Sequence, residues 1–462
     1  MANQLNVADI QGFVLRGYNF PFARYLLLEL EGPGKGRDFI GQIIPHVTTG
    51  QRWDNGKPQS TVNIAFTHKG LARLGLPDAT LLSFPVEFLQ GMKARNEILC
   101  DTGRNASENW DEVWRKDVVH VWLGVNALTP AALDERCAEM ERIMRQTGGA
   151  RLLEAQDAKA VFIDNQPTSK EHFGYTDGFG NPDFEGAVRH SQPGQGKLTK
   201  EGDWIALATG EFVLGYPDEA GELPLAPVPH LLANNGTFMV YRKLHQNVAT
   251  FREFLDAQSR AYGGGKEKFA AKIVGRWRDG TPIELSPDAG DPKIVADAKR
   301  NVKFTYGQDA SGARCPLGAH IRRANPRDSA GFHGQLVNRR RITRRGMPYG
   351  EYVPEGEPVS DHDDRGVIFM VLNASIFRQF EFVHQQWIEY GNDAHQGSDK
   401  DALVGNHDGR GRFLIQGSTD PKNPPFVCAR LPQFVELRGG DYFFMPSLTA
   451  LRLIADNSVD PR

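Results

Sequence analysis

Apolar runs of strand length recur along the first part of the chain, and polar or helical segments separate them. Each run is short, is rich in β-branched or aromatic residues, and is long enough for a strand but not for a helix. Four strands are predicted here: FARYLLLEL (Phe22 to Leu30), TVNIAFT (Thr61 to Thr67), DVVHVWLGV (Asp117 to Val125) and RLLEA (Arg151 to Ala155).

A helix is predicted between the third and fourth of these strands. Its apolar residues Leu133, Cys137, Met140 and Met144 recur at i, i+4, i+7 and i+11, which places them on one face of a 3.6-residue helix. The pattern starts near Pro130 and stops at the glycine pair that begins at Gly148, a typical helix end.

The same arrangement recurs in the second part of the chain. Strands are predicted at GTFMVYRKL (Gly236 to Leu244), RGVIFMVLN (Arg365 to Asn373) and DYFFMPS (Asp441 to Ser447). Two amphipathic helices follow the first two of them, with these apolar positions: Val248, Phe251 and Leu255, then Ile376, Phe380, Val383 and Trp387.

Strands that alternate with single amphipathic helices predict an α+β fold in which helices cover a sheet. Each half of the chain suits a βαββαβ unit, so we expect two ferredoxin-like halves, each an antiparallel sheet with helices. The division is predicted near residue 230, with an N-terminal half over 1–230 and a C-terminal half over 231–462.

Composition narrows the functional classes. The 462 residues carry a formal charge of -3, which argues against a nucleic-acid partner. The longest apolar runs, such as the one from Tyr25 to Leu28, are far too short to span a membrane. The four cysteines have no metal or redox spacing, and the amino terminus lacks the pattern of a secretory signal, so we expect a cytoplasmic protein. The sequence is compatible with a homo-oligomer but does not establish one.

Two long segments are rich in glycine, proline and charge, from Gly186 to Ala233 and from Gly263 to Gly350. Such segments are usually functional loops or disorder. Just before the first lies GYTDGFGNP, Gly174 to Pro182, in which glycines flank Asp177. Glycine lets a flat ligand approach the main chain, so Asp177 can be aimed into a cavity. A simple Asp-Gly turn explains the same residues.

The segment CPLGAHIRRANPRDS, Cys315 to Ser329, places His320 after small residues and before several arginines. Histidine is the usual protein ligand of haem iron in peroxidases and globins, and arginines such as Arg322 pair well with the haem propionates. An ordinary histidine in a basic surface loop is the alternative, and there are 13 histidines to choose from.

The third motif is NRRRITRRGMPYGEYV, Asn338 to Val353, in which five of the seven residues 339–345 are arginine. Buried together they would lose too much solvation, so most must face water or anions. A solvated basic strand is the simple explanation, and spacing alone does not select one arginine.

In this order the motifs resemble those of the dye-decolourising peroxidase family. GYTDG matches its glycine–any–any–Asp–glycine signature, AHIRRANPR its histidine segment, and RRGMPYG its distal arginine segment, which selects Arg344. RGVIFMVLN matches the segment that lines its distal pocket. The resemblance begins at DIQGFVLRGYN and runs nearly end to end; the length and the lack of a signal suggest the longer bacterial branch rather than the secreted fungal one.

The resemblance implies one haem b per chain, held by the C-terminal half, with His320 as the iron ligand. Val367 and Phe369 would lie over the haem, and an aspartate of GSDKDALVG (Gly397 to Gly405) would accept the other N–H of His320. Asp401 fits the family pattern better than Asp399, and a merely polar loop is the alternative.

Cleavage of a peroxide O–O bond needs a group that moves a proton between the oxygens and a positive group that stabilises the developing charge. We expect Asp177 to move the proton and Arg344 to stabilise the charge, with hydrogen peroxide as oxidant and a dye-like or other aromatic reductant. Gly346 stands where one branch has asparagine, so Asp177 would act without that amide.

Bulky reductants need an electron route to the surface. Trp387 and Tyr349 match redox-active aromatics proposed in some relatives, although core packing explains Trp387 and the Pro-aromatic-Gly turn explains Tyr349.

Two rival functions remain at the level of sequence. One is a haem-binding protein for haem transport or iron release, and the other is a haem-free scaffold with anion-binding loops. If His320 is not the ligand, His333 and His384 are the next candidates.

Overall fold

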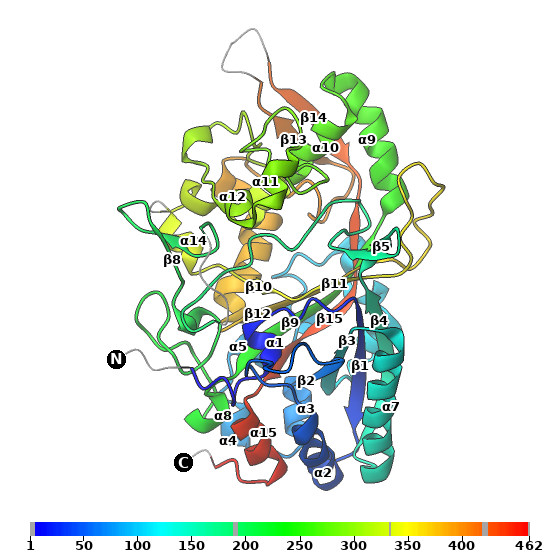
Figure 1. The fold of residues 1–462 in the computed structure, drawn as a ribbon, viewed down its shortest axis with the longest axis vertical. Coiled ribbons are helices and arrows are strands. Elements are labelled where there is room, and N and C mark those ends of the chain that lie inside the picture. Colours follow the sequence, from blue (N-terminus) through cyan, green and yellow to red (C-terminus); the bar gives the residue numbers. More distant parts are fainter. Residues whose placement is uncertain (1–4, 188–192, 332–333, 418–423, 461–462) are drawn as a thin grey trace.

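Antiparallel strands form the centre of the molecule. The computed structural model describes residues 5–187, 193–331, 334–417 and 424–460. Its main sheet has the order β10-β12-β9-β15-β2-β3-β1-β4, and β11 also pairs with β12. Long strands cross the middle of the molecule, with helices α2, α7 and α15 at one end and the segment that carries α10 to α12 at the other (Figure 1).

The first half forms a ferredoxin-like unit, as predicted. Its strands run in the order β2-β3-β1-β4, and every neighbouring pair is antiparallel. The unit consists of β1 (Phe22–Leu30), α2 (Pro33–Ile43), β2 (Ser60–Phe66), β3 (Val121–Ala127), α7 (Pro130–Thr147) and β4 (Ala150–Lys159).

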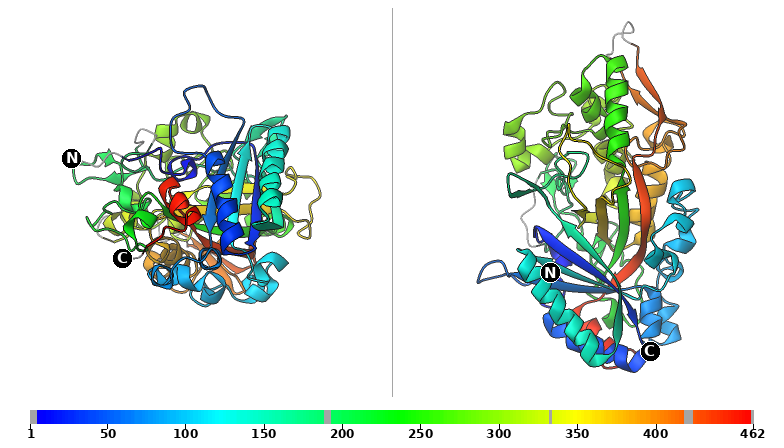
Figure 2. Two further views of the ribbon diagram at one scale, coloured as in Figure 1. Left: turned by 90° about the horizontal axis from the view of Figure 1, so that it is seen from below. Right: turned by 90° about the vertical axis from the view of Figure 1, so that its right-hand side faces the viewer.

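Helix α7 has the ends that the sequence predicts. The Thr129 hydroxyl accepts a hydrogen bond from the Ala132 amide, Pro130 occupies the first turn, and Gly148 closes the helix at a φ of 57°. The predicted apolar residues are buried, and α7 packs beside α2 on the sheet of this unit (Figure 2).

The third strand begins later than predicted, at Val121 instead of Asp117. Asp117 has a φ of 57°, in the left-handed region, so the chain turns there before it enters the sheet. The fourth strand is longer than RLLEA because it pairs with β1 along almost its whole length.

The second half repeats the topology. Its sheet has the order β15-β9-β12, and both short strands that carry the basic motif pair with the far edge of β12. The elements are β9 (Thr237–Gln246), α9 (Val248–Tyr262), β10 (Thr343–Arg344), β11 (Met347–Tyr349), β12 (Gly366–Asn373), η9 (Ile376–Glu381), η10 (Val383–Ile388) and β15 (Val435–Met445).

The last predicted helix differs in kind. Residues 376–388 form two π-helical segments rather than an α-helix, so the 3.6-residue period was the wrong geometry for this stretch. Ile376, Phe380, Val383 and Trp387 are nevertheless all buried, because the wider turns still direct them to the protein interior.

One core serves both units. Strand β15 pairs with β2 where Phe444 lies opposite Phe66, and this pairing joins the two sheets. Tyr25 of the first unit meets Tyr241 of the second edge to face, with ring centroids 6.3 Å apart. A boundary at residue 230 stays a prediction, since the apolar core continues across it.

The two loop segments are more ordered than the sequence suggests. The described residues of the second segment form five short α-helices, one of which, α13, begins at His320. The elements of these segments are β7 (Lys197–Leu198), β8 (Trp204–Ile205), α8 (His230–Ala233), α10 (Lys266–Val274), α11 (Pro292–Ala296), α12 (Ala298–Val302), α13 (His320–Ala324) and α14 (Gln335–Asn338).

Shorter elements complete the fold. They are α1 (Gly12–Leu15), α3 (His68–Arg73), α4 (Asp78–Leu81), α5 (Val86–Gln90), α6 (Glu112–Arg115), β5 (Val161–Ile163), β6 (Gln166–Thr168), β13 (Gly411–Ile415), β14 (Phe426–Leu431) and α15 (Leu448–Ala455).

A buried ion pair ties the two units together. Arg95 donates from Nε and Nη2 to the two carboxylate oxygens of Glu381, at 2.5 and 2.6 Å, and the Tyr442 hydroxyl also donates to Glu381, at 2.8 Å. Both charged side chains are almost completely buried.

Replacing Arg95 by alanine should destabilise the protein, because the Glu381 carboxylate would then be buried without its cation. We expect a loss of about 3–5 kcal/mol in the free energy of unfolding, measured by denaturant titration. The double variant R95M/E381M should recover most of this loss. A loss below about 1 kcal/mol in R95A would show that Glu381 does not depend on Arg95.

Candidate functional site

Asp177 lies in a tight loop shaped by glycine. Gly174, Gly178 and Gly180 have φ values of 91°, 91° and 73°, which other residues rarely adopt. The Asp177 amide donates to the Ser169 carbonyl at 2.7 Å, and its carboxylate accepts from the Gly178 amide at 2.6 Å. The loop therefore fixes the direction of the carboxylate.

Arg344 meets this carboxylate from the other unit. Its Nη1 donates to Asp177 Oδ1 at 2.7 Å and its Nη2 to the Phe179 carbonyl at 2.7 Å. The Arg344 amide also donates to Asn181 Oδ1 at 3.0 Å. Two bonds to this loop hold the guanidinium and a third holds the main chain of Arg344. Of the five clustered arginines, only Arg344 is ion-paired with Asp177 in the described part of the chain.

The pKa of Asp177 lies below its ordinary value. Burial by itself raises this pKa, but the Arg344 guanidinium and the Gly178 amide more than offset it, and the charge of His320 adds to the lowering. The Asp177 side chain is 55% exposed, so a small molecule can reach it. Protein atoms still surround it and partly desolvate its carboxylate.

His320 is the first residue of helix α13, and a carboxylate lies behind it. Its Nδ1 is 3.0 Å from Oδ2 of Asp401, which is fully buried. The other oxygen of Asp401 accepts from the amides of Leu403 and Val404, both at 2.9 Å. Asp399, the other candidate from the sequence, instead accepts a hydrogen bond from Arg412, with Nε 3.0 Å from Oδ1.

The Asp177–Arg344 pair and the His320–Asp401 pair act on each other electrostatically. Burial lowers the pKa of His320, but the Asp401 carboxylate outweighs it and raises this pKa overall; the charges of Arg344 and Asp177 act on it as well. The structure thus brings His320, Asp177 and Arg344 within electrostatic reach of one another, although they lie far apart in the sequence.

Strand β12 adds the apolar part of the site. Arg344 on β10 lies opposite Val371, and in a strand every second residue shares a face. Val367 and Phe369 therefore lie on the same face of the sheet as Arg344. Both are only half-buried, although they belong to an interior strand.

Gly346 sits too close to β12 for a side chain. A Cβ there would lie 2.5 Å from the Ile368 carbonyl oxygen, so an amide at this position would require the backbone to move.

The structure directs Arg322 away from a cofactor role. Its Nη1 donates to Asp309 at 3.1 Å and to the Cys315 carbonyl at 2.7 Å, and its Nη2 donates to the Asp309 carbonyl at 2.8 Å. These bonds use the guanidinium within the protein, so the prediction that Arg322 binds an anionic cofactor has no support in its contacts.

Three other arginines are better placed for anions. Arg276, Arg327 and Arg341 make no ion pair in the described part of the chain and donate to carbonyl or amide oxygens instead. Burial together with the charge of Arg327 lowers the pKa of Arg276 and of Arg341 to about 9. Sequence reasoning missed Arg276, because no motif singles it out from the other arginines.

The two candidate relay aromatics are both buried. Trp387 packs against Phe382 edge to face, with centroids 5.5 Å apart, and its indole N–H donates to Asp393 at 3.3 Å. Tyr349 lies beneath the Lys243 ammonium, 5.0 Å from its ring centroid. A role for either in electron transfer stays a prediction.

The two alternative iron ligands, His384 and His333, stay untested predictions. His384 stacks on Phe380 in the interior, at a centroid distance of 5.6 Å. His333 lies outside the described residues.

Comparison with known proteins agrees with the fold. The family model described as "DyP dimeric alpha+beta barrel domain" matches residues 9–152. A dye-decolorizing peroxidase of Mycetinis scorodonius is 28% identical over 97% of this chain and 88% of its own length. A solved structure of an ancestral D-type dye decolorizing peroxidase has a TM-score of 0.82 and 29% identity, and the match covers 97% of this chain and 99% of its own.

The chain thus resembles dye-decolorizing peroxidases over nearly its whole length, in sequence and in fold. It is therefore a peroxidase, and so an oxidoreductase. A multifunctional dye peroxidase of the bacterium Amycolatopsis is 34% identical, over 61% of this chain and 60% of its own length. Since fungal relatives match over far more of the chain, the expected bacterial branch is not supported by the matches. No helix among the described residues is long and apolar enough to cross a membrane.

Replacing Asp401 by asparagine tests the electrostatics behind His320. The amide keeps a hydrogen-bond acceptor but loses the charge, so burial should dominate and the pKa of His320 should fall below its ordinary value of about 6.5. An NMR titration of the imidazole in protein prepared without cofactor measures this. An unchanged pKa would mean that Asp401 does not control the charge of His320.

Proposed function

We propose that this peroxidase holds one haem b on His320 and reduces hydrogen peroxide while oxidising dyes or other aromatic reductants. The observation that carries the proposal is the pairing of Asp177 with Arg344 within electrostatic reach of a histidine backed by Asp401. A haem carrier has no need of the first pair.

The second nitrogen of His320 suits an iron ligand. Within the residues that the structure describes, no hydrogen bond or ion pair reaches Nε2, and the side chain is 28% exposed. The contact with Asp401 orients the ring and makes the imidazole more electron-donating, as carboxylates behind metal-ligating histidines do.

The arginine group suits the acidic edge of the cofactor. Arg276, Arg327 and Arg341 are partly or wholly buried, and the charge of Arg327 repels the other two. No carboxylate among the described residues forms an ion pair with any of the three. Two propionates in their midst would relieve that repulsion through charge-assisted hydrogen bonds. Haem b, with two such groups, matches this requirement.

Bound haem would supply the iron that exchanges electrons with peroxide and with the reductant. The protein supplies the proton transfer. Because its pKa is lowered, Asp177 is a carboxylate over a wide pH range and can accept a proton from one peroxide oxygen. It then returns that proton to the departing oxygen, which leaves as water.

Arg344 stabilises the charge that develops as the O–O bond breaks. Its position is set before peroxide arrives, because Phe179 and Asn181 hold it, so little reorganisation is needed at the moment of reaction. Gly346 contributes no side chain, which leaves Asp177 as the proton carrier of this pair.

Val367 and Phe369 make the space beside this pair apolar and small. A bulky dye would be excluded from it, so its electrons would have to travel through the protein. Trp387 is the better candidate for that route, since its indole N–H already has a carboxylate partner in Asp393.

An absorption spectrum tests the cofactor assignment. Protein expressed with adequate haem should show a Soret band that changes on addition of one equivalent of peroxide. In His320→Ala the band should shift and weaken, because the iron loses its protein ligand. A spectrum that H320A leaves unaltered would move the ligand elsewhere, and a protein without any Soret band would contradict the proposal.

The pH dependence tests the proton carrier. The rate constant for the reaction with peroxide should stay constant from neutral pH down to about pH 4 and fall only below it, because Asp177 must be ionised and its pKa is lowered. In Arg344→Leu the main lowering influence is lost, so the fall should move to higher pH.

Asp177→Asn should slow the peroxide reaction by about 10²–10⁴-fold at every pH. The matched control is Asp399→Asn, which changes the same chemical group on the loop of Asp401, where Asp399 pairs with Arg412 and not with Arg344. A wild-type midpoint near 6.5, or a D177N rate equal to that of D399N, would contradict the role of Asp177.

A further inference from the structure

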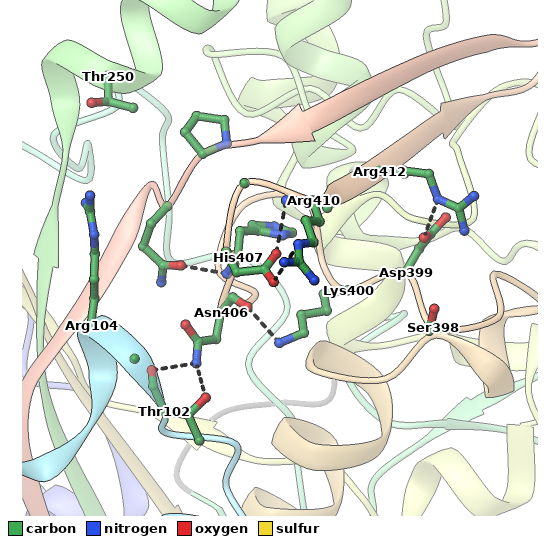
Figure 3. A pocket seen from close by; sticks show the side chains of 16 residues that line it. Thr102, Arg104, Thr250, Ser398, Asp399, Lys400, Asn406, His407, Arg410 and Arg412 are labelled. Atoms are coloured by element: carbon green, nitrogen blue, oxygen red, sulfur yellow. Dashed lines mark hydrogen bonds and ion pairs between the residues drawn. The ribbon is translucent and has the colours of Figure 1, made fainter.

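A cavity of about 810 Å³ opens beside the loop that carries Asp401 (Figure 3). Its size falls in the range of small-molecule sites. It lies away from Asp177 and Arg344, neither of which lines it. The lining residues come from three distant parts of the chain: 102–104, 398–400 with 406–412, and 432–433; Thr250 also lines it.

Hydrogen bonds hold the wall of this cavity in place. The Asn406 side chain donates to the carbonyls of Cys100 and Thr102, at 2.8 and 2.9 Å. Lys400 donates to the Asn406 carbonyl at 2.6 Å, and the His407 amide donates to Gln433 at 2.6 Å. The cavity is thus a preformed feature of the fold, built like a binding site on supported side chains.

His407 connects the cavity to the iron ligand. It lines the cavity, and its Nε2 donates to the main-chain carbonyl of Asp401 at 2.9 Å. The carboxylate of the same residue lies 3.0 Å from His320 Nδ1. Two hydrogen bonds and the few covalent bonds of one aspartate therefore join the cavity wall to His320.

The proton on His407 can be assigned from its partners. Nδ1 has no hydrogen-bond partner among the described residues, and the carbonyl at Nε2 requires a donor, so the ring is neutral with its proton on Nε2. Burial, the main cause, lowers the pKa of His407 in agreement with this form.

The rim of the cavity is positive. Arg410 is 91% exposed and only loosely paired with Asp408, at 3.8 Å. Arg104 is 70% exposed and shares Glu436 with Arg438, at 3.1 and 3.0 Å. Figure 3 shows Arg104 on one side of His407 and Arg410 on the other.

The other two cations of the lining are neutralised. Lys400 pairs with Glu389 at 3.1 Å and Arg412 with Asp399 at 3.0 Å. Arg410 is thus the lining cation with the longest ion pair, and Arg104, although it contacts Glu436, leaves most of its side chain exposed to an acidic group from solvent.

We propose that this cavity is a second reductant site, which takes a small phenol bearing a carboxylate or sulfonate, and that His407 and Asp401 carry its electron to His320. The proposal rests on the peroxidase function proposed above. The acidic group would pair with Arg410 or Arg104 at the rim, and the phenol ring would lie deeper, toward His407.

The electron balance follows from the peroxidase reaction. Each phenol loses one electron through His407 and Asp401 and releases its phenolic proton to water, leaving as a phenoxyl radical. Two phenols supply the two electrons that peroxide consumes as its O–O bond breaks. With two protons, the oxygens leave as two waters.

Equilibrium binding tests the site without turnover. Calorimetry on the full-length holoprotein would compare 4-hydroxybenzoate with its uncharged methyl ester. Arg410→Ala and Arg104→Ala should each weaken binding of the acid by roughly fivefold and leave the ester unchanged. The control Arg452→Ala, an exposed arginine on α15 at the opposite end of the molecule, should change neither. Equal binding of acid and ester, or no binding of the acid, would overturn the proposal.

Single-turnover kinetics test the route. After one equivalent of peroxide, reduction by saturating 4-hydroxybenzoate should be at least about tenfold slower in His407→Phe, which lacks the hydrogen bond to Asp401. His407→Gln keeps an amide donor and should recover most of the rate. The Soret spectrum of both variants must match the wild type, which excludes a displaced His320. An H407F rate equal to wild type would overturn the route.

The two proposals fail in different ways. Loss of the peroxidase function would appear as no reaction with peroxide in the wild type, whatever the calorimetry shows. Failure of the second site would appear as normal peroxide reduction without charge-dependent binding in the cavity.

Discussion

The site depends on the attachment of Arg344 to one short loop. Arg344 belongs to the sheet of the second unit, whereas the loop from Asp177 to Asn181 follows the first unit. Three hydrogen bonds, to Asp177, Phe179 and the Asn181 side chain, join them. Because each end is held by its own unit, the position of the acid relative to the cation reflects the packing of the whole molecule.

Electrostatics then give similar groups different tasks. Asp177 and Asp401 are both desolvated carboxylates whose pKa is held down by a neighbouring cation. Asp401 is fully buried and has its remaining oxygen satisfied by amides, so it can only orient and polarise His320. Asp177 has exposed surface and can meet a substrate. Solvent access, not charge, separates the two roles.

The loop around Asp401 contacts both His320 and the wall of the cavity. Its carboxylate faces His320 while its main-chain carbonyl faces His407, so one residue borders both the candidate haem site and the cavity. Arg323 supports the same region from the other side, since it donates to the carbonyls of Trp387 and Asp399. A displacement of the loop around Asp401 would therefore alter both the position of His320 and the wall of the cavity at His407.

The sequence by itself determined the architecture, because strand and helix periods are local properties of the chain. The apolar strand Phe22–Leu30 and the capped, one-sided helix from Pro130 to Thr147 both appear as predicted. It also determined which motifs carry the chemistry, since glycine around Asp177 and small residues before His320 are visible without a structure.

Only the tertiary structure decided which charges meet. It paired Asp177 with Arg344, placed Asp401 rather than Asp399 on His320, and turned Arg322 inward to Asp309. It also brought Arg276 and Arg341 within electrostatic reach of Arg327 and shaped the cavity beside His407. These are contacts between residues distant in sequence, and their energies depend on burial and direction, neither of which local composition encodes.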